Sequence, residues 1–153
     1  VLLGEENNHR SFVYFMHNNL PEGPSYPIRS ISDGVYHYIR NLTPDKLYIE
    51  KHLMGSWKNY ENGYWISWIE DSFNNEKTCR LVNRYMKRPP EELYNIADDP
   101  CEMNNLADNS HYTEIKEKLK EQLELWMQEQ NDPGPEIDTE EALKSAKNGE
   151  HFF

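Results

Sequence analysis

The chain has 153 residues, which is a usual length for one compact domain, but only 37% of them are hydrophobic and the mean hydropathy is −0.96. The net charge of −11 is a C-terminal property, because residues 1–90 carry 11 Lys/Arg and 10 Asp/Glu whereas residues 91–153 carry 5 and 17. Such a surface repels phosphate backbones, so nucleic acid is excluded as an expected partner, and no apolar run is long enough to cross a bilayer.

The first 42 residues and a short segment after residue 90 have the pattern of β-strands. Residues 11–17 (SFVYFMH) predict a buried strand, and a loop rich in Asn, Pro and Gly follows. Residues 28–32 and 35–42 flank Asp33-Gly34, a pair that tolerates positive φ at both central positions of a type I′ turn, so a hairpin is expected. A further strand is expected over residues 92–96.

Between residues 43 and 88 we expect a loop followed by one or two helices. Residues 112–130 form the clearest predicted helix, capped by Asn109 or Ser110. Its apolar stripe consists of Ile115, Leu119, Leu123, Trp126 and Met127. Residues 136–153 are expected to be an acidic tail with a short helix over 139–147 and no evident contribution to a core.

Residues 91–107 (EELYNIADDPCEMNNLA) join a short apolar strand to a dense set of turn residues. Asp98, Asp99 and Pro100 should end the strand through side-chain hydrogen bonds and a fixed proline φ. Asn104 and Asn105 offer side-chain oxygens to the following turn. The residue chemistry by itself therefore predicts an ordered turn.

This run resembles a signature near the C-terminus of type I sulfatases, the formylglycine-dependent enzymes that hydrolyse sulfate esters and sulfamates, and within them the heparan N-sulfatase (sulfamidase) group. The matching residues are Glu92, Leu93, Tyr94, Asn95, Asp99, Pro100, Glu102, Asn105, Leu106 and Ala107. Asn95 stands where Asp is usual. Residues 26–42 look like the hairpin that opens the C-terminal sheet of the same family, and the resemblance covers roughly residues 13–134.

The expected fold is therefore α+β: a small antiparallel sheet of about four strands, packed by a long C-terminal helix, with a helical insertion. The resemblance identifies it as the C-terminal subdomain of an alkaline-phosphatase-like sulfatase fold, with residues 1–135 as the subdomain and 136–153 as the acidic tail. It also implies a periplasmic, secreted or lysosomal location.

The family's chemistry needs formylglycine, made from a Cys or Ser in a Cys/Ser-x-Pro-x-Arg motif, and a calcium ion. Neither Cys79 nor Cys101 lies in that motif, and the two are compatible with one disulfide or with two free thiols. We therefore expect no catalytic residue, no metal ligand and no cofactor in this chain. Calcium and formylglycine are expected in an N-terminal sulfatase domain upstream of Val1, and the chain by itself is expected to be inactive.

Substrate binding is the contribution that the chain can make. In the resembled family the first strand and its loop lie near the mouth of the active site, which makes His17, Asn18 and Asn19 the candidates. Their imidazole and carboxamide groups can donate hydrogen bonds to sulfate or to sugar hydroxyls. The alternative is a strand-end histidine followed by loop-forming asparagines.

Two further groups have a functional and a structural interpretation. Aromatic rings can stack on sugars or pack helices together, and the candidates are Trp57, Tyr64, Trp65 and Trp68. Arginines can meet a sulfated ligand or pair with carboxylates, and these are Arg29, Arg40, Arg80, Arg84 and Arg88. His37 is most simply a cross-strand packing residue, and the sequence shows no defensible Ser/His/Asp arrangement.

The expected partners are the N-terminal sulfatase domain of the same protein and a sulfated, glycosaminoglycan-like saccharide. Two other functions fit the same residues. The chain could be a free-standing carbohydrate-binding module that uses its aromatic insertion, or a non-catalytic structural fragment.

Overall fold

A computed structural model describes residues 10–21, 23–54 and 63–149 of the chain. The chain forms two compact units. The first consists of residues 1–17, 28–40 and 91–132, and the second of residues 18–27, 41–90 and 133–153. Each unit is built from segments that are distant in the sequence.

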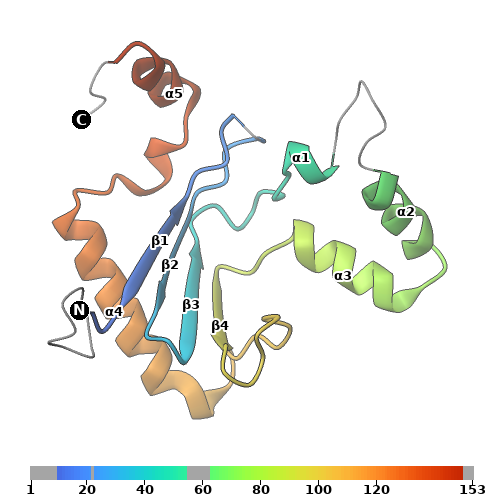
Figure 1. Ribbon diagram of the computed structural model, residues 1–153, viewed down its shortest axis with the longest axis horizontal. Coiled ribbons are helices and arrows are strands. Elements are labelled where there is room, and N and C mark those ends of the chain that lie inside the picture. The colour runs from blue at the N-terminus through green and yellow to red at the C-terminus, as the bar shows by residue number, and fades with distance from the viewer. Residues whose placement is uncertain (1–9, 22, 55–62, 150–153) are drawn as a thin grey trace, which may run out of the picture. The chain divides into compact units, whose positions relative to one another are not determined.

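The first unit is a four-stranded antiparallel sheet with a long helix on one face (Figure 1). The strands are β1 (Val13–His17), β2 (Ile28–Ser32), β3 (Tyr36–Asn41) and β4 (Glu91–Asn95), in the spatial order β1-β2-β3-β4. Phe15 pairs with Ser30 across β1 and β2, and Tyr38 pairs with Leu93 across β3 and β4. The predicted α+β fold is confirmed.

The helix on the sheet is α4 (Thr113–Glu129), preceded by the short 3-10 helix η1 (Ser110–Tyr112). The Asn109 side chain accepts a hydrogen bond from the His111 backbone at 3.1 Å and so caps η1, whereas α4 itself begins after Tyr112 without a side-chain cap. Leu119 and Leu123 of the predicted stripe are fully buried. The core also contains Ile31, Tyr38, Leu93, Leu106 and Ala107.

Two local expectations for the sheet are wrong. β1 is an edge strand whose Phe15 is 49% exposed, so it is not a buried strand. The hairpin forms, but positive φ in the pair Asp33-Gly34 is confined to the glycine, which excludes a type I′ turn. Asp33 instead uses its carboxylate to accept hydrogen bonds from the backbone of Val35 at 2.9 Å and of Tyr36 at 2.7 Å.

The second unit contains the predicted helical insertion. Its helices are α1 (Lys51–Met54), α2 (Gly63–Ser72), α3 (Glu76–Met86), the 3-10 helix η2 (Gly134–Ile137) and α5 (Glu140–Lys147). Asn75 caps α3 by accepting hydrogen bonds from the backbone of Lys77 and Thr78. None of the helices within the described ranges combines the length and the apolar character that a membrane crossing requires.

The segment expected to be a tail contributes buried residues to the second unit. Thr139 caps α5 by accepting a hydrogen bond from the Ala142 backbone at 3.1 Å. Ala142 is 7% exposed and Asp138 is 2% exposed. The expectation that residues 136–153 add nothing to a core is therefore wrong for these two, while the boundary at residue 135 remains a prediction.

Candidate functional site

The 91–107 segment, which carries the recognisable signature, closes on itself through side-chain hydrogen bonds. The Asn105 side-chain oxygen accepts from the backbone of Leu93 at 2.9 Å and of Ala107 at 3.0 Å. The Leu106 backbone donates to Leu93 at 2.8 Å, and Leu106 enters the core. The predicted ordered turn is confirmed, and Asn105 is the residue that fastens it to β4.

The turn at the end of β4 depends on Asn95 and on the aspartates that follow it. The Asn95 side-chain oxygen accepts from the backbone of Ala97 at 3.2 Å, and its amide donates to the Asp98 carboxylate at 2.7 Å. Asp99 accepts from the Asn104 backbone at 2.7 Å. These contacts give the two aspartates a structural role, as the sequence indicated.

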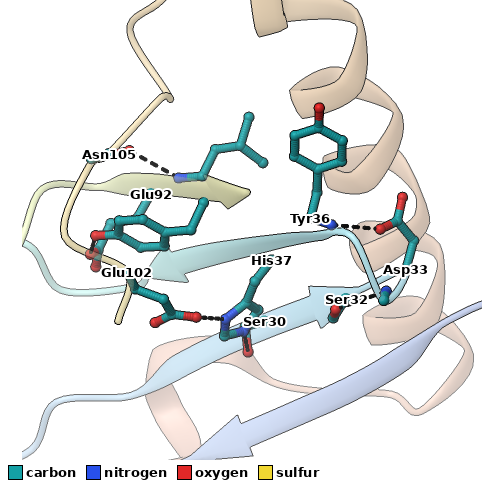
Figure 2. Close-up of polar contacts among 11 residues, drawn as sticks. Ser30, Ser32, Asp33, Tyr36, His37, Glu92, Glu102 and Asn105 are labelled. Atoms are coloured by element: carbon teal, nitrogen blue, oxygen red, sulfur yellow. Dashed lines mark hydrogen bonds and ion pairs between the residues drawn. The ribbon is translucent and has the colours of Figure 1, made fainter. Parts of the chain in front are cut away.

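The signature residue Glu102 reaches back to the sheet (Figure 2). Its φ of +53° is unusual for a residue with a side chain, and its carboxylate lies 2.5 Å from His37 Nδ1. The other ring nitrogen of His37 lies 2.9 Å from the Ser30 hydroxyl. The sequence did not predict this cluster, and it assigned His37 to cross-strand packing. That packing is also present, because the ring centroids of His37 and Phe15 lie 5.7 Å apart.

A hydroxyl, an imidazole and a carboxylate in this order resemble the arrangement that activates serine nucleophiles. With Nδ1 donating to the Glu102 carboxylate, Nε2 of a neutral His37 accepts from the Ser30 hydroxyl. Ser30, however, sits inside β2 and is only 6% exposed. The cluster therefore ties the 91–107 segment to β2 and β3. Residues 30 and 37 lie on the same face of the sheet, and that placement is the signal from which the cluster could have been predicted.

A second polar cluster connects β3 and β4 to α4. The Tyr38 hydroxyl donates to the Glu91 carboxylate at 2.6 Å, and the Lys120 ammonium lies 2.9 Å from the same oxygen. Burial raises the pKa of Tyr38. Burial also tends to raise the pKa of Glu91, but the hydrogen bonds from Tyr38 and Lys120 and the charge of Lys116 outweigh it and lower that pKa overall.

The three candidates for substrate binding lie in different settings. His17 is the last residue of β1 and Asn18 follows it, and both are partly exposed. Asn19 is fully buried, and its side-chain amide donates to the carbonyls of Pro24 and Ile49, each at 2.7 Å. Asn19 is therefore a loop-forming residue, as the structural alternative predicted. His17 and Asn18 remain predicted contact residues.

The arginines mainly follow the structural interpretation. Arg29 is fully buried and binds both carboxylate oxygens of Asp132 just beyond the end of α4. Arg40 pairs with Glu124 at 2.9 Å. On α3, Arg80 lies 3.6 Å from Glu76.

The aromatic candidates of α2 belong to a series of ring contacts in the second unit. Trp65 is buried and lies 5.9 Å from Trp68 and 5.5 Å from Tyr85. Trp68 is 46% exposed and Tyr64 is 48% exposed. Helix packing therefore accounts for Trp65, and Trp57 lies outside the described residues.

The residues that the structure describes do not fit the catalytic groups of a sulfatase. They contain no cluster of three or more His, Cys, Asp or Glu side chains that could hold a metal ion. Cys79 and Cys101 are both free thiols.

Comparison with known proteins gives matches to sulfatases. The chain is 34% identical over 134 residues to an ulvan-active sulfatase of Formosa agariphila, a match that covers 86% of this chain and 24% of that protein. It is 26% identical over 116 residues to human N-sulphoglucosamine sulphohydrolase, covering 71% and 21% of the two chains. No protein-family profile matches the chain.

The solved structure of a 2-O GAG sulfatase has a similar fold. The TM-score is 0.50 at 16% sequence identity, and the match covers 84% of this chain and 18% of the other. The chain thus spans about a quarter or less of the length of these proteins.

Proposed function

The chain is related to the type I sulfatases and corresponds to their C-terminal region, and from this premise we propose that it completes the substrate pocket of a sulfatase whose reactive centre lies in a preceding domain. The observation that carries the proposal is the match over 86% of this chain to only 24% of a sulfatase. The resemblance to the family supports the further proposal that calcium and formylglycine are held by that preceding domain.

The contribution to the pocket is proposed for the end of β1 and the loop after it. His17 and Asn18 are partly exposed, but Nε2 of His17 is buried, so Asn18 is the main proposed contact of the two. An imidazole and a carboxamide can donate to the oxygens of a sulfate group and can exchange hydrogen bonds with sugar hydroxyls. Asn19 contributes by shaping the loop, since its amide is committed to two carbonyls.

The names of the similar proteins support a proposal for the substrate class. Their names describe action on ulvan, on N-sulphoglucosamine and at the 2-O position of glycosaminoglycans. We propose that the complete protein hydrolyses a sulfate ester or sulfamate of a polysaccharide of this kind, with a glycosaminoglycan-like sugar as the expected case.

The division of labour can be tested by comparing the 153-residue chain with the longer protein that contains it. Both are incubated with calcium and with sulfated ulvan oligosaccharides or N-sulphoglucosamine, and released sulfate is measured. We expect sulfate from the longer protein and none from the chain. Sulfate release by the chain would contradict the proposal, as would a longer protein that binds these saccharides without hydrolysing them.

A further inference from the structure

Asp138 is a buried carboxylate that organises the loop after β1. Its Oδ2 accepts hydrogen bonds from the backbone of Asn19 at 2.9 Å and of Tyr26 at 2.6 Å. Its Oδ1 accepts from the backbone of Leu20 at 2.9 Å. All four residues belong to the second unit, and Asp138 is 2% exposed. Three backbone donors thus compensate for the burial of the carboxylate. Each donor is more than 110 residues away from Asp138 in the sequence.

The loop closes tightly around Asn19. The Gly23 backbone donates to the Asn19 carbonyl at 2.8 Å, while the Asn19 side chain donates to Pro24 and Ile49. A Cβ atom on Gly23 would lie 1.8 Å from the Ile49 carbonyl oxygen, so only glycine fits there. Both the backbone and the side chain of Asn19 are therefore held by hydrogen bonds.

The segment that carries Asp138 is itself ordered. Asp138 ends η2, and Thr139 caps α5 immediately after it. The carboxylate is therefore presented from a short turn between two helical elements. Through Asp138, this turn supports the backbone at Asn19, Leu20 and Tyr26.

We propose that Asp138 is a positioning residue for substrate recognition: by holding Asn19 it fixes the neighbouring Asn18 in the conformation that contacts the saccharide. This inference rests on the proposed function, in which that loop forms a wall of the pocket. Asp138 itself is buried behind the loop and is not a contact residue. Both carboxylate oxygens of Asp138 accept from backbone N–H groups. In Asp138→Asn, either orientation of the side-chain amide would therefore place its NH2 group against a backbone N–H.

The first arm of the test uses the chain alone and needs no ligand. Amide hydrogen exchange is compared in the wild-type chain, in Asp138→Asn, and in Glu136→Gln, which makes the same charge change at an exposed site. The amides of Asn19, Leu20 and Tyr26 should exchange about tenfold faster in Asp138→Asn only. The Leu106 amide, bonded to Leu93 in the first unit, reports whether the fold is intact. Unchanged exchange at the three amides would overturn the inference.

Asp138→Glu covers the case in which Asp138→Asn fails to fold. The glutamate keeps the charge but extends it by one methylene, so intermediate protection of the three amides is expected. If Asp138→Asn does not fold, wild-type exchange of the three amides in Asp138→Glu, or exchange that rises equally at Leu106, would overturn the inference.

The second arm measures hydrolysis of sulfated ulvan oligosaccharides by the longer protein. Asp138→Asn should raise KM about tenfold and change kcat by less than about twofold. Asp138→Glu should give a KM between those of the wild type and Asp138→Asn. Glu136→Gln should have the KM and kcat of the wild type. Asn18→Ala separates the two proposals. If Asn18→Ala raises KM and Asp138→Asn does not, the positioning role is wrong. If Asn18→Ala has no effect, Asn18 is not part of a pocket wall and the positioning role fails with it, although the exchange result for the loop stands.

Discussion

At the scale of single residues, the sulfatase signature describes a folding device and not a reactive centre. Asn105 binds two backbone amides and Glu102 binds His37, so both fasten the turn to the sheet. Asn95, which departs from the usual Asp, is also explained. Its amide donates to the Asp98 carboxylate at 2.7 Å, a contact that a second carboxylate would replace by repulsion between like charges.

The residue-scale prediction concerns Glu91. Glu91→Gln should lower the free energy of unfolding at pH 7 by about 1 kcal/mol, because it removes the charged partner of Lys116 and Lys120. The folded-state pKa of Glu91 lies below its ordinary value of 4.5, so its stabilisation is present above pH 4.5 and is lost as the pH falls through the lowered value. The difference from wild type should therefore shrink in acid.

Urea unfolding at pH 7 and at several lower pH values measures this difference. Glu121→Gln, which changes the same charge at an exposed site on α4, serves as the control. A difference that stays constant down to strongly acidic pH would mean that the Glu91 charge does not stabilise the fold.

At the scale of elements, α4 is the part of the first unit whose burial the sequence pattern predicts best. Leu119 and Leu123 are fully buried against the sheet, and Trp126 at the next position of the stripe stacks on Tyr14 of β1 with ring centroids 5.0 Å apart. At its end, the buried pair of Arg29 and Asp132 fastens the chain to β2. Helix packing and this ion pair together hold α4 on the sheet.

Leu123→Ala should destabilise the chain by about 2–5 kcal/mol, because it removes buried methyl groups and leaves a cavity. Leu125→Ala is the matched control, since Leu125 lies on the same helix and is 50% exposed, and it should cost less than about 0.5 kcal/mol. Thermal unfolding followed by circular dichroism compares the two. Equal losses from both variants would show that the assigned core face of α4 is wrong.

At the scale of the whole molecule, charge and exposed apolar groups support the proposed dependence on a larger protein. In the described part of the chain, Phe15, Ile66 and Phe73 are 49%, 50% and 81% exposed, which leaves apolar surface that another domain can cover. The net charge of −11 gives the isolated chain a repulsive field for sulfated polymers.

We therefore expect the isolated chain to pass through a column of immobilised heparin, a sulfated polysaccharide, at pH 7 and low salt. The same chain should be retained on a quaternary ammonium resin, which carries the opposite charge. Retention on heparin that is lost as salt is added would show a basic binding surface on this chain, and would favour a free-standing carbohydrate-binding module.

Local pattern in the sequence determined the strands, the long helix with its buried stripe, and the signature turn, because alternation, helical spacing and capping act between near neighbours. The tertiary structure alone decided which polar groups meet. Glu102 binds His37 across 65 residues, Arg29 binds Asp132 across 103, and Asp138 binds Asn19 across 119. Pairs so far apart leave no periodic trace in the sequence, because only the folded chain brings the two residues together. Arg29 and Asp138 are also buried, so each of these charges needs a partner.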